Sequence, residues 1–140
     1  MGLFYLNYIA EPVEFGEPAP VEQVETIKRT KSFKLSHRAK THILYGDRSG
    51  GGHKFGIGKP CKSEFPQEWD EQEIIQAVEH IAANDNIDWH KQKNGYFITN
   101  QKYEKLQIRV VMSADKTEVI TAYPTNVQRN YCPPKPANDN

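Results

Sequence analysis

Residues 106–112 read Leu-Gln-Ile-Arg-Val-Val-Met, with apolar side chains at every second position from the first. Successive side chains of a β-strand point to opposite faces, so this alternation predicts a strand with one buried face. Residues 95–99 and 118–123 also favour strands, and residues 113–117 have the composition of a hairpin turn. The C-terminal half of the chain is therefore predicted to contain a β-sheet.

One amphipathic helix is predicted before these strands. Residues 70–73, Asp-Glu-Gln-Glu, have the pattern of a capping box, and residues 84–86, Asn-Asp-Asn, mark the end of the helix. The apolar residues between them follow helical spacing: Ile74, Ile75, Val78, Ile81 and Ala82. A helix beside strands indicates the α+β class.

Charge is segregated along the chain although the formal net charge is zero. Residues 28–62 carry ten Lys or Arg and one acid, whereas residues 64–88 carry eight Asp or Glu and no Lys or Arg. The basic segment would attract a polyanion, and the acidic segment fits a solvated helix face. Two solubilising surfaces would explain the same pattern, so charge alone does not decide between these interpretations.

The composition limits the class of protein. A chain of 140 residues is enough for one domain with a single core. No apolar run approaches the roughly 18 residues that a membrane span needs. Cys61 and Cys132 are too few for a disulfide framework or a metal cluster, and the sequence leaves open whether they pair.

Residues 41–53 place two histidines on either side of a glycine-rich bend. Residues 41–45 are rich in β-forming types, which predicts a strand with His42 at its end. Histidine exchanges protons near neutral pH, so His42 and His53 fit acid–base chemistry on a phosphodiester. The amides of Gly51 and Gly52 could donate hydrogen bonds to phosphate oxygens.

Familiar cofactor motifs are not found. Gly58-Lys59 lacks the Ser or Thr that a P-loop needs next, because Pro60 follows. The chain has no HExxH, CxxC or EF-hand pattern. A metal held by His42, His53 and Asp47 remains as an alternative.

Three blocks in order resemble the bacterial EndoU nuclease family. They are residues 42–53, residues 58–66 with Trp69 soon after, and residues 120–124, Ile-Thr-Ala-Tyr-Pro. The resemblance implies an α+β fold in which an N-terminal helical segment and one amphipathic helix pack on a twisted antiparallel sheet.

Local composition and the extent of this resemblance together imply an organisation of the chain. Residues 1–35 would form an arm and a short helix over residues 21–31, within the same domain. Residues 36–126 would form the nuclease core, and residues 127–140 a C-terminal tail.

For the reaction, the resemblance implies attack of a ribose 2′-hydroxyl on the adjacent phosphorus. His53 would be the base, His42 the acid, and either Lys62 or Lys59 the cation beside the phosphorane, with Lys62 favoured. Cys61 stands where the family usually has glycine before the lysine. No cofactor is required, and assistance by Mn²⁺ is the less favoured alternative.

For substrate binding, the resemblance assigns Ser63, Thr121 and Tyr123 to the nucleotide, with Tyr123 stacking on sugar or base. The expected substrate is RNA, with tRNA as one candidate. Two other functions remain open, a non-catalytic RNA-binding module and a metal-dependent phosphodiesterase.

The resemblance further implies a toxin module of a larger secreted or delivered protein that acts in the cytoplasm of a target cell. A cognate immunity protein would neutralise it. We expect the free domain to be a monomer.

Overall fold

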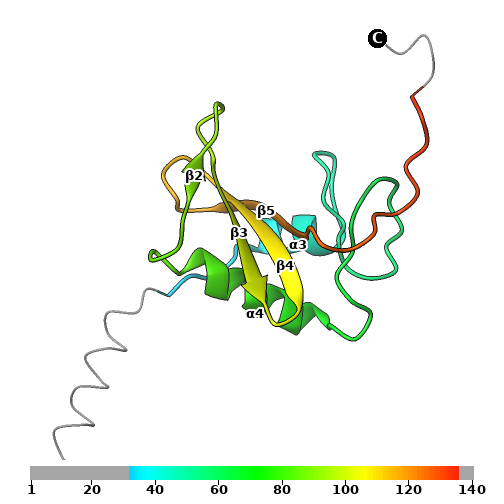
Figure 1. Cartoon of the computed structure of the whole chain (residues 1–140), viewed down its shortest axis with the longest axis horizontal. Helices are drawn as coiled ribbons and strands as arrows, with labels where there is room; N and C mark the ends of the chain where they lie inside the picture. Colours follow the sequence, from blue (N-terminus) through cyan, green and yellow to red (C-terminus); the bar gives the residue numbers. More distant parts are fainter. Residues whose placement is uncertain (1–31, 136–140) are drawn as a thin grey trace, which may run out of the picture. The chain divides into compact units, whose positions relative to one another are not determined.

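The computed structural model describes residues 32–135, and the expected arm and the helix over residues 21–31 lie outside the described residues apart from residues 32–35. Residues 32–135 contain two helices and four strands (Figure 1). In chain order they are α3 (His37–Leu44), α4 (Glu71–Ala82), β2 (His90–Lys91), β3 (Phe97–Tyr103), β4 (Leu106–Met112) and β5 (Val119–Pro124). The predicted α+β class is confirmed.

The four strands form one antiparallel sheet in the order β2-β3-β4-β5. Strand β4 has the predicted bounds, and the predicted turn over residues 113–117 joins it to β5. Strand β3 starts later than expected, because Gly95 has a positive φ of 92° and its amide donates to the carbonyl of Gln92 in a turn. This strand then continues to Tyr103, which pairs with Leu106.

Helix α4 is the predicted amphipathic helix. The Asp70 side chain caps it by accepting a hydrogen bond from the Glu73 amide at 2.8 Å. The helix packs on β4 along one face of the sheet (Figure 1). Its buried face is made by Ile74, Ala77, Val78, Ile81 and Ala82, and the inner face of β4 by Leu106, Ile108, Val110 and Met112.

The prediction of a strand over residues 41–45 is wrong, because these residues end helix α3. Ser36 caps this helix through a hydrogen bond from the Ala39 amide to its hydroxyl oxygen at 3.1 Å. Ala39 and Ile43, one turn apart, are both buried, so the helix has an apolar stripe that starts before the β-branched residues. Packing and capping thus override a local β preference.

Helix α3 packs against β5, the strand at the end of the sheet. His42 therefore lies beside Thr121 of this strand, and a site can form where helix and sheet edge meet. Within residues 32–135, neither helix is long and apolar enough to cross a membrane.

Candidate active site

The glycine-rich loop folds back on the C-terminal end of α3. The last carbonyls of a helix have no partner within the helix. Here amides of the loop donate hydrogen bonds to them. Gly52 donates to the His42 carbonyl at 2.9 Å, His53 to the Ile43 carbonyl at 2.7 Å, and Lys54 to the Leu44 carbonyl at 3.1 Å. These three bonds hold the segment of His53 against the segment of His42.

Gly51 allows this close approach. Its φ is +79°, and a Cβ atom at this position would overlap the carbonyl oxygen of His42. The Gly52 amide is already used by that carbonyl, so it is not available to a phosphate. Among the residues that the structure describes, the Gly51 amide has no hydrogen-bond partner, and Gly51 lines the cavity described below. Of the two amides suggested by the sequence, only that of Gly51 can serve a substrate.

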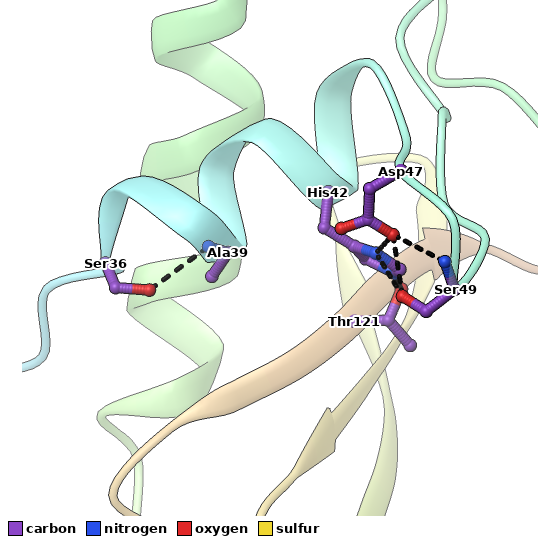
Figure 2. A network of polar contacts seen from close by, with 6 residues as sticks. All are labelled: Ser36, Ala39, His42, Asp47, Ser49 and Thr121. Carbon is purple, nitrogen blue, oxygen red and sulfur yellow. Dashed lines mark hydrogen bonds and ion pairs between the residues drawn. The ribbon is translucent and has the colours of Figure 1, made fainter.

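His42 is held by polar contacts on both ring nitrogens (Figure 2). Its Nδ1 lies 3.0 Å from Asp47 Oδ1 and 3.3 Å from Ser49 Oγ. Its Nε2 lies 3.1 Å from the hydroxyl of Thr121. An ionised carboxylate can only accept a hydrogen bond, so the Nδ1–H group of His42 donates to Asp47. Nε2 is thereby presented toward β5.

Asp47 is kept ionised by its own partners. The Ser49 hydroxyl donates to Oδ1 at 2.6 Å and the Ser49 amide at 2.9 Å. The Ser49 side chain first, and His42 second, lower the pKa of Asp47 to about 2. The sequence suggests Asp47 only as a metal ligand, and the structure instead shows it as a hydrogen-bond partner of His42.

His53 is buried and has a fixed tautomer. Its Nδ1 donates to the carbonyl oxygen of Ser63 at 2.7 Å, so Nε2 of the neutral ring carries the free lone pair. Burial lowers the pKa of His53 and the charge of Lys62 lowers it further, which outweighs the opposing effect of the Ser63 carbonyl. The ring of Tyr123 stacks on it at 5.2 Å between centroids. The neutral form of His53 is favoured near neutral pH.

One cavity of about 570 Å³ joins these groups. Both histidines line it with Ser63, Thr121 and Tyr123, and none of its lining residues is Asp or Glu. The complete lining is His42, Ser49, Gly51, His53, Cys61, Lys62, Ser63, Arg109, Thr121, Tyr123, Pro124, Thr125, Val127 and Arg129. The structure thus brings sequence-predicted residues from three separate blocks to one site, with the exception of Lys59 and Gly52.

The two candidate lysines, Lys62 and Lys59, differ in their position relative to the cavity. Lys62 lines the cavity, and its Nζ is close to Gly50 of the glycine loop. Lys59 is not part of the lining, and its side chain packs over Gly46 and Gly52. This geometry favours Lys62 as the cation near a bound phosphate.

Residues 130–132 fasten the loop that carries Lys62. Cys61 and Cys132, whose pairing the sequence left open, form a disulfide. The Asn130 amide donates to the Lys62 carbonyl at 2.8 Å, and the Cys61 amide to the Tyr131 carbonyl at 3.1 Å. Cys61 has a φ of 69°, the left-handed conformation that glycine adopts most readily. Cys61 thus keeps the backbone geometry that a glycine would provide.

Glu64, in the same segment, ties the loop to its surroundings. Burial alone would raise its pKa, but hydrogen bonds from the amides of Gly56 and Gly58 and from Asn130 outweigh burial and lower the pKa. The Glu64 carboxylate is therefore stabilised by hydrogen bonds from within the protein. Glu64 does not line the cavity.

Arg109 and Arg129 also line the cavity, and the sequence reasoning missed them. Arg109 is on β4 directly opposite Tyr123. It occupies a position of the strand alternation that faces away from the core, which was the available signal. Arg129 follows β5 outside any regular element, where no pattern marks it. Residues 32–135 contain no group of three or more His, Cys, Asp or Glu side chains placed to hold a metal ion.

An α+β domain with two histidines and a lysine in one basic cavity has the components of a nuclease site. The family model described as bacterial EndoU nuclease matches residues 56–126, half of the chain. The chain therefore belongs to the bacterial EndoU nuclease family and is an EndoU-type endoribonuclease. The match includes Lys62, Ser63 and the Thr121–Tyr123 segment and begins after His53. Neither a curated protein nor a solved structure matches the chain significantly.

Proposed function

We propose that this endoribonuclease cuts RNA by attack of the ribose 2′-hydroxyl on the adjacent phosphorus. The products are a 2′,3′-cyclic phosphate and a 5′-hydroxyl. One observation carries the proposal: His42, His53 and Lys62 line a single cavity that has no carboxylate in its lining. The reaction needs a base, an acid and a cation, and these three side chains supply one of each.

His53 is the base in this scheme. Its lowered pKa and its Nδ1–H bond to Ser63 leave the Nε2 lone pair ready to accept the proton of the 2′-hydroxyl. Tyr123, stacked on His53, is in position to contact the same nucleotide. Ser63 also lines the cavity, and its hydroxyl would contact the nucleobase.

His42 is the acid that protonates the leaving 5′-oxygen. The Asp47 carboxylate holds the ring of His42 by accepting a hydrogen bond from Nδ1 at 3.0 Å. The Nε2 atom of His42 lies 3.1 Å from the Thr121 hydroxyl oxygen, and in this scheme it donates a proton to the leaving oxygen when RNA is bound. Lys62 would stabilise the charge that develops on the phosphorane oxygens.

We further propose the biological role implied by the family. The domain would be the toxic part of a larger delivered protein, would act on tRNA or another structured RNA in the target-cell cytoplasm, and would be neutralised by an immunity protein. An inhibitor with acidic side chains would fit the cavity, since Lys62, Arg109 and Arg129 all line it. Expression of the chain alone should stop bacterial growth, and a His53→Ala chain should not.

The chemistry is tested by the ends of the fragments. Purified protein is incubated with RNA in the presence of EDTA, and the ends are identified by mass spectrometry. Cyclic phosphate and 5′-hydroxyl ends are expected, and a 2′-deoxy nucleotide at the cut site should block cleavage. Loss of activity in EDTA with recovery in Mn²⁺, together with cleavage at 2′-deoxy sites, would instead establish a metal-dependent phosphodiesterase.

A further inference from the structure

The cavity holds more positive charge than the scissile phosphate requires. One phosphodiester carries a single negative charge, and Lys62 is already in place beside the glycine loop to meet it. Arg109 and Arg129 line the same cavity. Neither is paired with a carboxylate within residues 32–135. Two arginines therefore remain available to an anionic ligand.

The position of Arg109 relates this charge to the nucleotide site. Arg109 is the cross-strand partner of Tyr123, and side chains opposite each other on neighbouring strands lie on the same face. Val111, on the same face, pairs with Thr121, which contacts His42. Tyr123, which is assigned to the nucleotide, thus lies between Arg109 on one side and His53 on the other.

Arg109 is also held in a fixed orientation. Its Nε donates to the side-chain oxygen of Asn100 on β3 at 2.9 Å, so the terminal amino groups of the guanidinium stay free. A guanidinium anchored in this way can donate two parallel hydrogen bonds to a phosphate. Arg129 is exposed, follows β5 and lines the same cavity.

We propose that Arg109 and Arg129 form a second phosphate subsite, which binds a backbone phosphate next to the scissile one. This inference rests on the proposed function, because it extends the RNA path from the same cavity. The subsite contributes to binding of an RNA longer than two nucleotides and takes no part in the proton transfers.

The test compares two substrates. The first is a pyrimidine–purine dinucleotide with one phosphodiester, and the second is a hexanucleotide with the same central pair. The Arg109→Gln and Arg129→Gln variants should each lower kcat/KM on the hexanucleotide by at least about tenfold, mainly through KM, as expected for the loss of one or two charge-assisted hydrogen bonds. On the dinucleotide both should stay within about twofold of wild type.

Salt dependence provides a second readout. Each lost phosphate contact should reduce the slope of log(kcat/KM) against log[salt] on the hexanucleotide by about 0.7. An Arg109→Lys variant should keep the slope of wild type while losing part of the affinity. Arg38→Gln is the matched control, because Arg38 is exposed on α3 and lies outside the cavity.

Equal losses on both substrates would overturn the subsite, and so would arginine variants that behave like Arg38→Gln. Both results leave the proposed function intact as long as wild type yields cyclic phosphate ends. A wild-type protein that cuts neither substrate would overturn the two together. Arg129 is exposed, so its replacement gives a decisive result even if the Arg109 variant is unstable.

Discussion

At the residue scale, burial and a neighbouring charge act on His53 in the same direction. Its buried ring resists protonation, and the ammonium of Lys62 adds electrostatic repulsion against a second positive charge. Lys62 therefore has two effects in this account. It stabilises the phosphorane, and it keeps the base neutral before the substrate arrives.

The coupling predicts a shift in the pH profile. His53 must be neutral to act, so the rate should rise with pH through a pKa below 6.5, the ordinary value of histidine. Replacing Lys62 with Met removes one cause of the lowered pKa, so the acidic limb of log(kcat/KM) should move to higher pH while the rate falls. Lys59→Met is the control and should leave the limb in place. A Lys62→Met limb that stays fixed or moves to lower pH would contradict the assignment.

Tyr123 gives a second prediction at this scale. Its ring stacks on His53 in the cavity. In the proposed complex the ring also stacks on the nucleobase, and such a contact is worth about 1–3 kcal/mol. Tyr123→Ala should lower kcat/KM on RNA by roughly five- to 150-fold, while Tyr123→Phe, which keeps the ring, should stay within about threefold. Steady-state kinetics on the dinucleotide checks this. Equal losses in both variants would show that the hydroxyl, and not the ring, is what matters.

At the scale of elements, the site depends on the junction between α3 and the glycine loop. The carbonyls at the helix end and the amides of the loop satisfy one another, so the two histidines are positioned by backbone contacts. This arrangement requires that no side chain separates the loop from the helix. Gly51 meets that requirement.

Gly51→Ala should therefore disrupt the junction. The added methyl group would overlap the His42 carbonyl and would force a residue with a Cβ into a positive φ. We expect a loss of stability of about 1–3 kcal/mol and a large loss of activity, measured by denaturant unfolding and RNA cleavage. Gly56→Ala is the control, because a Cβ there meets no atom within 4 Å although its φ is also positive. Similar activity losses in the two variants would contradict a specific role of the Gly51 approach.

The elements that the sequence predicted correctly are encoded by local sequence patterns. The alternation in residues 106–112 and the cap at Asp70 with its apolar stripe each define an element without help from distant residues. Residues 41–45 are rich in β-forming types, but the features that make this segment helical, Ser36 and Ala39, precede it in the chain. Tertiary packing decided the conformation there.

The site was predictable in part for the same reason. Histidines that flank a glycine bend are a local pattern, and they do reach one cavity. The contact of His42 with Thr121 spans 79 positions and the disulfide spans 71, so neither follows from local spacing. Arg129 has no pattern at all, and only the folded chain brings it to the cavity.

At the scale of the whole molecule, distant parts of the chain hold the loop of Lys62 in place. Asn130, Tyr131 and Cys132 bind it through backbone hydrogen bonds, an Asn side chain and the disulfide. The segment after β5 is thus part of the site's support. The carbonyl that orients His53 belongs to Ser63 in the same loop.

Removing the disulfide should affect both stability and activity. Cys132→Ser opens a long closed loop, and a cost of about 2–4 kcal/mol in unfolding free energy is expected. Lys62 should also be positioned less well, so kcat/KM should fall. Cys61→Ser and treatment of wild type with a reducing agent should reproduce both effects, as denaturant titration and cleavage assays would show. An unchanged rate in all three cases would mean that the hydrogen bonds of Asn130 and Tyr131 hold the loop without the disulfide.

The central claim is that His42 acts as acid and His53 as base. It is tested most directly with an RNA dinucleotide in which sulfur replaces the bridging 5′-oxygen, since a thiolate leaves without a general acid. On the ordinary dinucleotide, His42→Ala and His53→Ala should each lose at least about 10²-fold in rate. On the sulfur substrate His42→Ala should recover to near the wild-type rate, while His53→Ala should stay slow. Recovery of His53→Ala instead of His42→Ala would contradict the assignment.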